Sequence, residues 1–132
     1  MSTLIASLDT FRAHLARHPE LPDLVSVQLQ DSYFGDHVRG QLDGANLARV
    51  ATKLLAWADT LHGYTAHAWR VPDGGSVHVD VIGNLSGACV LRVFAGVSYD
   101  PDVFPDLEPD GRQSVGVSTL RAWVANGAGV AA

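Results

Sequence analysis

The chain is poor in cysteine, in positive charge and in long hydrophobic runs. Its single cysteine, Cys89, excludes an internal disulfide and an all-cysteine metal site. Nine basic residues against fourteen acidic ones give a formal net charge of −5. Nonspecific binding to nucleic acid needs a concentrated basic surface, so the sequence predicts none. No run approaches the ~20 apolar residues of a membrane span, and the N-terminus lacks the basic start of a secretion signal. We therefore expect a cytoplasmic protein that does not bind membranes.

What the chain does contain is enough for one folded domain. Its 132 residues are 47% hydrophobic and 17% charged, which is typical of a globular protein. This length fits a single domain over residues 1–132, in which residues 127–132, made of alanine, glycine and valine, form a frayed tail.

The N-terminal segment predicts a helix followed by a half-buried strand. The helix also contains His14 and His18, which are four residues apart. Because no carboxylate lies beside them, we expect no metal site there, and both histidines should lie at the surface. The apolar stripe of the helix, at helical spacing, is Leu4, Leu8, Phe11 and Leu15. Alternation then predicts a strand over residues 23–30 with Val25 and Val27 on its buried side, paired as a hairpin with a strand over 37–42.

A second helix is the strongest helical pattern in the chain. It should run over residues 44–62, with Asp43 as its N-terminal cap and Gly63 as its stop. A last helix should begin at Ser118 and end at Asn126-Gly127. Between these two helices the pattern predicts four strands, over residues 64–71, 76–85, 88–97 and 113–117.

The order of these elements defines a fold class. Tight turns between successive strands force antiparallel neighbours, and helices need a sheet face to cover. The sequence therefore predicts an α+β fold, a two-layer sandwich in which helices pack on one face of a mostly antiparallel sheet. That sheet has about six strands in two hairpin-type units.

One face of the central strands concentrates polar and aromatic side chains. Successive residues of a strand point to opposite faces, so a single face could gather His67, Trp69, His78, Asp80, Arg92 and Phe94. A cross-strand pair of Asp80 and Arg92 on an ordinary solvent face would account for the charged members. Exposed Trp69 and Phe94 would instead form an apolar patch of the kind that binds a partner.

The segment 100–110, here called the acidic loop, holds five acids, three prolines and no base, and so accounts for the whole net charge. A calcium-binding EF-hand is excluded because Phe104 stands where an oxygen donor belongs. We expect Phe104 to be buried. The unpaired acids of the loop should stay in water, namely Asp102, Asp106, Glu108 and Asp110.

Together these features predict a small non-catalytic binding or regulatory protein that makes protein–protein contacts, with a basic protein as one candidate partner. Its binding residues are Trp69, Phe94, Asp102, Asp106, Glu108 and Asp110. No cofactor or metal is expected, because the chain has no phosphate-binding glycine loop and two ligands on one strand leave zinc incompletely coordinated.

Two alternatives remain open. The first is a small hydrolase or isomerase, in which His78 is the base, Asp80 orients it and Arg92 holds an anion. The second is a structural subunit of a homo-oligomer, which buries Trp69 and Phe94 against a second copy of the chain.

Overall fold

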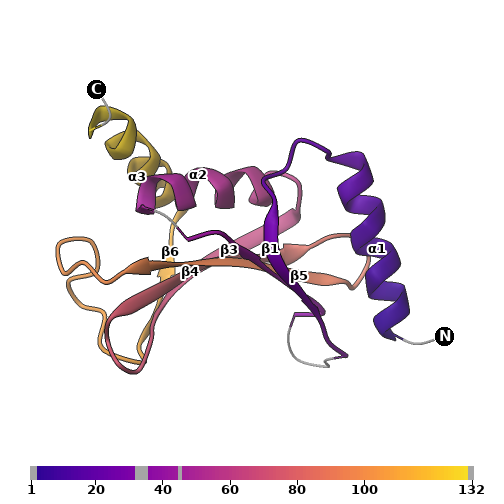
Figure 1. The fold of residues 1–132 in the computed structure, drawn as a ribbon, viewed down its shortest axis with the longest axis horizontal. Helices are drawn as coiled ribbons and strands as arrows, with labels where there is room; N and C mark the ends of the chain where they lie inside the picture. The colour runs from indigo at the N-terminus through magenta and orange to yellow at the C-terminus, as the bar shows by residue number, and fades with distance from the viewer. Residues whose placement is uncertain (1–2, 32–35, 45, 131–132) are drawn as a thin grey trace.

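The computed structural model describes residues 3–31, 36–44 and 46–130. Within them the chain forms three helices and six strands in the predicted order, which confirms the α+β fold (Figure 1). The elements are α1 (Thr3–Arg17), β1 (Leu24–Leu29), β2 (Val38–Leu42), α2 (Leu47–Ala58), β3 (His62–Arg70), β4 (Ser76–Asn84), β5 (Val90–Ser98), β6 (Arg112–Val115) and α3 (Val117–Val130).

The six strands form one mixed sheet in the order β1-β2-β5-β4-β3-β6. All neighbours are antiparallel except β2 and β5, which run parallel. The parallel pair follows from the path of α2, which carries the chain from β2 across the sheet to β3. The strands β3, β4 and β5 then return step by step to the side of β2. The hairpin of β1 and β2 is therefore joined to the unit of β3, β4 and β5 through the pairing of β2 with β5.

The hydrophobic core lies between the helices and one face of the sheet. Figure 1 shows α2 and α3 above the sheet and α1 beside it, and α2 contacts α3, β4 and β5. The buried face of α2 is made by Val50, Ala51, Leu54, Trp57 and Ala58. Alternate residues of β4, Val77, Val79 and Val81, meet this face with no solvent exposure. Their neighbours along β4, including His78 and Asp80, therefore point to the opposite face, here called the open face.

The ends of two helices differ from the sequence prediction. Helix α2 begins at Leu47, because the Asn46 side chain caps it by accepting a hydrogen bond from the Arg49 amide at 2.9 Å. The prediction of Asp43 as the cap was wrong, and so was the prediction of Gly63 as the stop, since α2 ends at Ala58 and Gly63 lies in β3. Helix α3 also continues past Asn126-Gly127 to residue 130, because an interior glycine costs a helix only about 1 kcal/mol.

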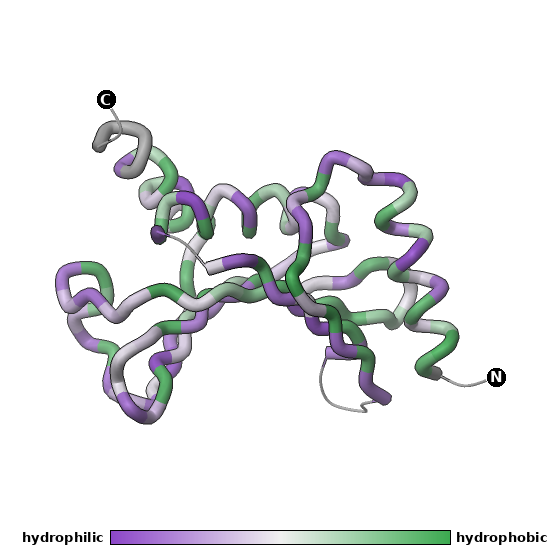
Figure 2. Tube along the Cα trace, viewed as in Figure 1, coloured by the Kyte–Doolittle hydropathy of each residue, from purple (hydrophilic) through white to green (hydrophobic). Residues whose placement is uncertain are grey.

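The apolar stripes of α1 and β1 are less buried than predicted. Helix α1 turns Ser7, Phe11 and His14 inward, and leaves Leu4 and Leu15 close to 40% exposed (39% and 38%). On β1, Val25 and Val27 are 61% and 47% exposed. Figure 2 shows hydrophobic positions along both segments. The prediction that Val25 and Val27 lie on the buried side of their strand was wrong, whereas of the predicted α1 stripe Phe11 is buried and Leu4 and Leu15 are exposed.

His14 is buried rather than at the surface, and its surroundings explain why. Its ring packs against Trp57 and His18, and its Nε2 lies 2.8 Å from the Thr60 hydroxyl. The Thr60 hydroxyl donates its only hydrogen to the Trp57 carbonyl at 2.7 Å, so it accepts from Nε2–H of His14. The bond to Thr60 thus fixes the tautomer of His14 and joins α1 to the end of α2.

Burial lowers the pKa of His14 from 6.5 to about 4, with help from the positive charges of His18, Arg17 and His62. Because the folded-state pKa lies below the unfolded one, the native state binds fewer protons. Its stability is therefore complete above pH 6.5 and falls as the pH drops toward 4. We expect His14 alone to account for a loss of about 3 kcal/mol by pH 4.

Urea unfolding of the wild type and of His14→Gln at pH 7.5 and pH 5 measures this effect. The glutamine amide can still donate to Thr60 but does not titrate. Equal losses of stability in the two proteins between these pH values would contradict the assignment to His14.

Candidate functional site: the open face and the acidic loop

The sheet register brings the predicted face residues together. On β3 and β4, His67 lies directly opposite Asp80 and Trp69 directly opposite His78. Across the next pair, Asp80 lies opposite Phe94, and Arg92 is one step along the same face of β5. All six residues of the predicted cluster therefore share the open face, as the alternation of the strands indicated.

Asp80 forms the charged centre of the open face. Its side chain is 1% exposed, with Oδ1 at 3.2 Å from Nδ1 of His67 and Oδ2 at 2.6 Å from Nη2 of Arg92. The predicted cross-strand pair of Asp80 and Arg92 is thus present. A buried carboxylate is costly unless it is paired and hydrogen-bonded, and these two neighbours from β3 and β5 meet that need.

In the hydrolase or isomerase alternative, Asp80 was expected to orient His78, but the histidine that it contacts in the structure is His67. Both carboxylate oxygens of Asp80 are directed at other groups, and the histidine in contact is His67. The two are direct neighbours in the register, whereas His78 lies two residues away on the same strand. Any histidine–carboxylate chemistry on this face would therefore use His67 and Asp80.

Three aromatic rings, Trp69, His78 and Phe94, make up what we call the aromatic row. The His78 ring meets Trp69 edge-on at 5.3 Å and stacks on Phe94 at 5.4 Å. All three side chains are half-buried. Burial lowers the pKa of His78, as does the positive charge of Arg92, so its ring is neutral at neutral pH. The row is an uncharged aromatic strip that is partly open to solvent.

The acidic loop divides into buried apolar and exposed acidic side chains, as predicted. Phe104 and Leu107 are buried, at 1% and 4% exposure. Asp102, Asp106, Glu108 and Asp110 are all exposed, and none takes part in the ion pairs found among the described residues. The apolar side chains therefore anchor the loop, and the four acids lie at its surface.

Arg70 holds the acidic loop in place, a role that the sequence analysis missed. Its guanidinium lies 3.5 Å from the ring centroid of Tyr99 and donates to the carbonyls of Leu107 and Gly74, each at 3.0 Å. These contacts link the loop to the 71–75 turn. Two of these partners, the Tyr99 ring and the Leu107 carbonyl, are distant in sequence, so no local spacing pattern encodes them.

The acidic loop and the aromatic row meet at one hydrogen bond. Nε1 of Trp69 donates to Oδ1 of Asp110 at 3.0 Å. Asp110 has φ of +62°, a left-handed conformation that aspartate tolerates better than most residues. Its backbone amide also donates to the Arg70 carbonyl at 2.8 Å. The acidic loop and the aromatic row, which the sequence analysis treated as separate features, thus form one continuous surface.

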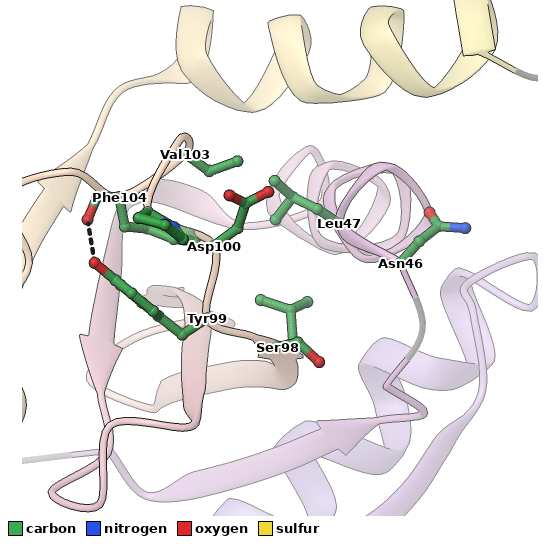
Figure 3. Close-up of a pocket in the computed structure, with 9 residues that line it drawn as sticks. Asn46, Leu47, Ser98, Tyr99, Asp100, Val103 and Phe104 are labelled. Carbon is green, nitrogen blue, oxygen red and sulfur yellow. Dashed lines mark hydrogen bonds between the residues drawn. The ribbon is translucent and has the colours of Figure 1, made fainter.

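A pocket of about 380 Å³ lies where the start of the loop faces the first turn of α2 (Figure 3). Its walls include Leu47, Val103 and Phe104, and the Asp100 carboxylate lies among them. The Tyr99 hydroxyl donates to the Phe104 carbonyl at 3.2 Å, and Asp100 accepts from the Asp102 amide at 2.9 Å. These bonds lie within the loop, and Asp100 is its one acid among the residues that line the pocket.

No protein-family model matches this chain, and searches of curated proteins and of solved structures find no similar protein. In the described part of the chain, no helix is long and apolar enough to cross a membrane. The same residues contain no group of three or more His, Cys, Asp or Glu side chains that could hold a metal ion.

Removal of the Asp80 carboxylate should strongly lower the stability of the protein. Asp80→Ala leaves the Arg92 guanidinium, whose side chain is 14% exposed, without its carboxylate. We expect a loss of about 3 kcal/mol in the free energy of unfolding, and a partial recovery in Asp80→Ala/Arg92→Met, where no uncompensated charge remains. Urea unfolding of both variants measures it. An Asp80→Ala variant as stable as the wild type would show that water satisfies the cluster.

The two classes of side chain in the acidic loop predict opposite effects on stability. Phe104→Ala should cost about 3 kcal/mol, as for other buried aromatic truncations. The triple variant Asp102→Asn/Asp106→Asn/Glu108→Gln should unfold at the same or a slightly higher urea concentration, because it removes only repulsion between solvated charges. A triple variant that is as unstable as Phe104→Ala would mean that the acids are structural.

Proposed function

We propose that this protein is a non-catalytic binding module, which binds a basic segment of a protein partner through the acidic loop and the aromatic row. The hydrogen bond between Trp69 and Asp110 supports this proposal most directly, because it places an aromatic surface next to a run of exposed acids. Neither part alone would define a partner, since solvated acids and half-buried rings are common on protein surfaces.

The chemistry of the surface favours arginine and lysine in the partner. The exposed carboxylates of Asp102, Asp106 and Glu108 attract positive charge and would speed association. The faces of Trp69 and Phe94 can receive a guanidinium through cation–π contact or an apolar side chain through burial. Aromatic anchors beside complementary charge are typical of residues that dominate binding energy at interfaces. A cytoplasmic setting is part of the same proposal.

Binding of an arginine-rich peptide that contains one tryptophan tests the role of the acids. We expect affinity that falls with salt, and a loss of roughly tenfold, or 1.4 kcal/mol, in Asp102→Asn/Asp106→Asn/Glu108→Gln. The matched control is Asp9→Asn/Asp43→Asn/Asp59→Asn, which changes the net charge equally at exposed positions outside the loop. Equal losses in the two triple variants would reduce the effect to net charge and contradict a specific acidic surface.

The aromatic row has a separate test with the same peptide. Trp69→Ala removes an anchor ring and should weaken binding by about 2 kcal/mol, or roughly 30-fold, whereas Trp123→Phe on α3 should have no effect. Trp69→Phe keeps a ring but loses the bond to Asp110, so it should fall between the wild type and Trp69→Ala. Wild-type affinity in Trp69→Ala would exclude the open face from the binding surface.

A second candidate function, a small hydrolase or isomerase, is favoured by one contact, that between Asp80 and His67. A carboxylate that is hydrogen-bonded to Nδ1 of a histidine can orient the ring and leave Nε2 to act as a base. Turnover of a panel of ester and small carbonyl substrates, abolished by His67→Gln but retained in His78→Gln, would support this function. Activity that survives His67→Gln would exclude His67 as the base, and a wild type that turns over none of these substrates would contradict this function.

A further inference from the structure

The pocket at the start of the acidic loop combines apolar walls with a single charge. Its apolar lining includes Leu47 on α2 and Val103 and Phe104 on the loop. Among the described residues that line it, Asp100 is the only one with a charged side chain. Its volume of about 380 Å³ lies near the lower end of the ~300–1,000 Å³ that is typical of ligand sites. The pocket therefore has room for one long side chain or a small molecule.

The carboxylate of Asp100 has room for a further partner. Its Oδ1 accepts a hydrogen bond from the Asp102 amide at 2.9 Å, and its side chain takes no part in the ion pairs found among the described residues. A carboxylate has about four lone-pair sites, so one hydrogen bond leaves most of its acceptor capacity unused. Figure 3 shows this carboxylate between Val103 and Leu47. A cation that enters the pocket would therefore meet it beside apolar walls.

Hydrogen bonds within the loop hold the pocket in shape. The amides of Val103 and Phe104 both donate to the Asp100 carbonyl, at 3.1 and 2.9 Å. The Tyr99 hydroxyl donates to the Phe104 carbonyl, and the buried Phe104 ring meets Trp123 of α3 edge-on at 5.7 Å. A site that is ordered before its ligand arrives loses less conformational freedom on binding. The pocket is thus prepared for an occupant in the unbound protein.

We propose that this pocket binds one arginine side chain of the basic partner, with the guanidinium at Asp100 and the methylene stem against Leu47 and Val103. This binding mode rests on the proposed function, which supplies the basic partner. Arginine buries an apolar stem while its head carries a positive charge, and apolar walls around a single carboxylate match both parts. The pocket adds a specific anchor to a surface that otherwise attracts any positive charge.

Arginine suits the pocket better than lysine does. A guanidinium is planar and more weakly hydrated than an ammonium group, so its transfer from water into a pocket costs less. Its fork of N–H donors can bond both oxygens of a carboxylate. Asp102, which follows Asp100 by two residues, is exposed and belongs to the surface proposed to bind the partner. The pocket is therefore continuous with that surface, and one partner segment can occupy both.

Butylguanidinium, an analogue of the arginine side chain, tests the pocket without the partner. At up to tens of millimolar it should shift the methyl NMR signals of Leu47 and Val103 in the wild type and much less in Asp100→Asn. The asparagine can still accept from the Asp102 amide, so the loop keeps its turn. Asp9→Asn, which removes the same charge at an exposed position on α1, is the matched control and should respond like the wild type. No shift of these methyl signals, or an equal shift with butyrate in place of butylguanidinium, would overturn the proposal.

The arginine-rich peptide separates a failure of the pocket from a failure of the proposed function. We expect Asp100→Asn to weaken peptide binding by roughly tenfold and Asp102→Asn by only roughly twofold, because a charge in a pocket contributes more than a charge at an exposed rim. Equal small losses in the two variants, with no methyl shift from butylguanidinium, would contradict the pocket and leave the proposed function standing.

The reverse outcome is also distinct. A peptide that binds the wild type no better than it binds Asp102→Asn/Asp106→Asn/Glu108→Gln, together with a methyl shift from butylguanidinium, would contradict the proposed function and support the pocket as a guanidinium site.

Discussion

A single buried carboxylate constrains the open face of the sheet. Asp80 sits in the central strand β4, where solvent does not reach it, so its neighbours must supply its hydrogen bonds. His67 on β3 and Arg92 on β5 do so, and this fixes the rings and charges on the strands at each side. On the same face, His78 lies between Trp69 and Phe94 and completes the aromatic row, and burial together with the charge of Arg92 lowers its pKa.

In the acidic loop, the apolar side chains and the acidic side chains have separate roles. Burial of Phe104 and the contacts of Arg70 hold the loop against the domain, and these interactions involve apolar groups and backbone carbonyls. The carboxylates of Asp102, Asp106 and Glu108 are exposed and take no part in these anchoring contacts. Asp110 is the exception, because it accepts from Trp69 and joins the loop to the open face. The basic partner that we propose would therefore meet an aromatic part and an exposed acidic part of one surface.

The sequence predicted whatever depends on local periodicity. Alternation along β3, β4 and β5 placed the six residues of the open face together, and the burial of Phe104 followed from the chemistry of its loop. Contacts between distant segments were out of reach, including Arg70 with the loop and His14 with Thr60. The α1 stripe was only partly right, with Phe11 buried and Leu4 and Leu15 exposed, because helical spacing identifies an apolar face but not what covers it. Asp43 failed as a cap because Asn46, three residues later, offers the same chemistry.

The most direct test of the account follows the Trp69 indole by nuclear magnetic resonance while an arginine-rich peptide is added. The Nε1–H signal of Trp69 reports on the junction between the aromatic row and the acidic loop, and that of the buried Trp57 is the internal control. We expect the Trp69 signal and the backbone amide signals of the acidic loop to shift together, with one dissociation constant. Loop amides that shift while the Trp69 signal stays in place would show that the loop and the open face are not one binding surface.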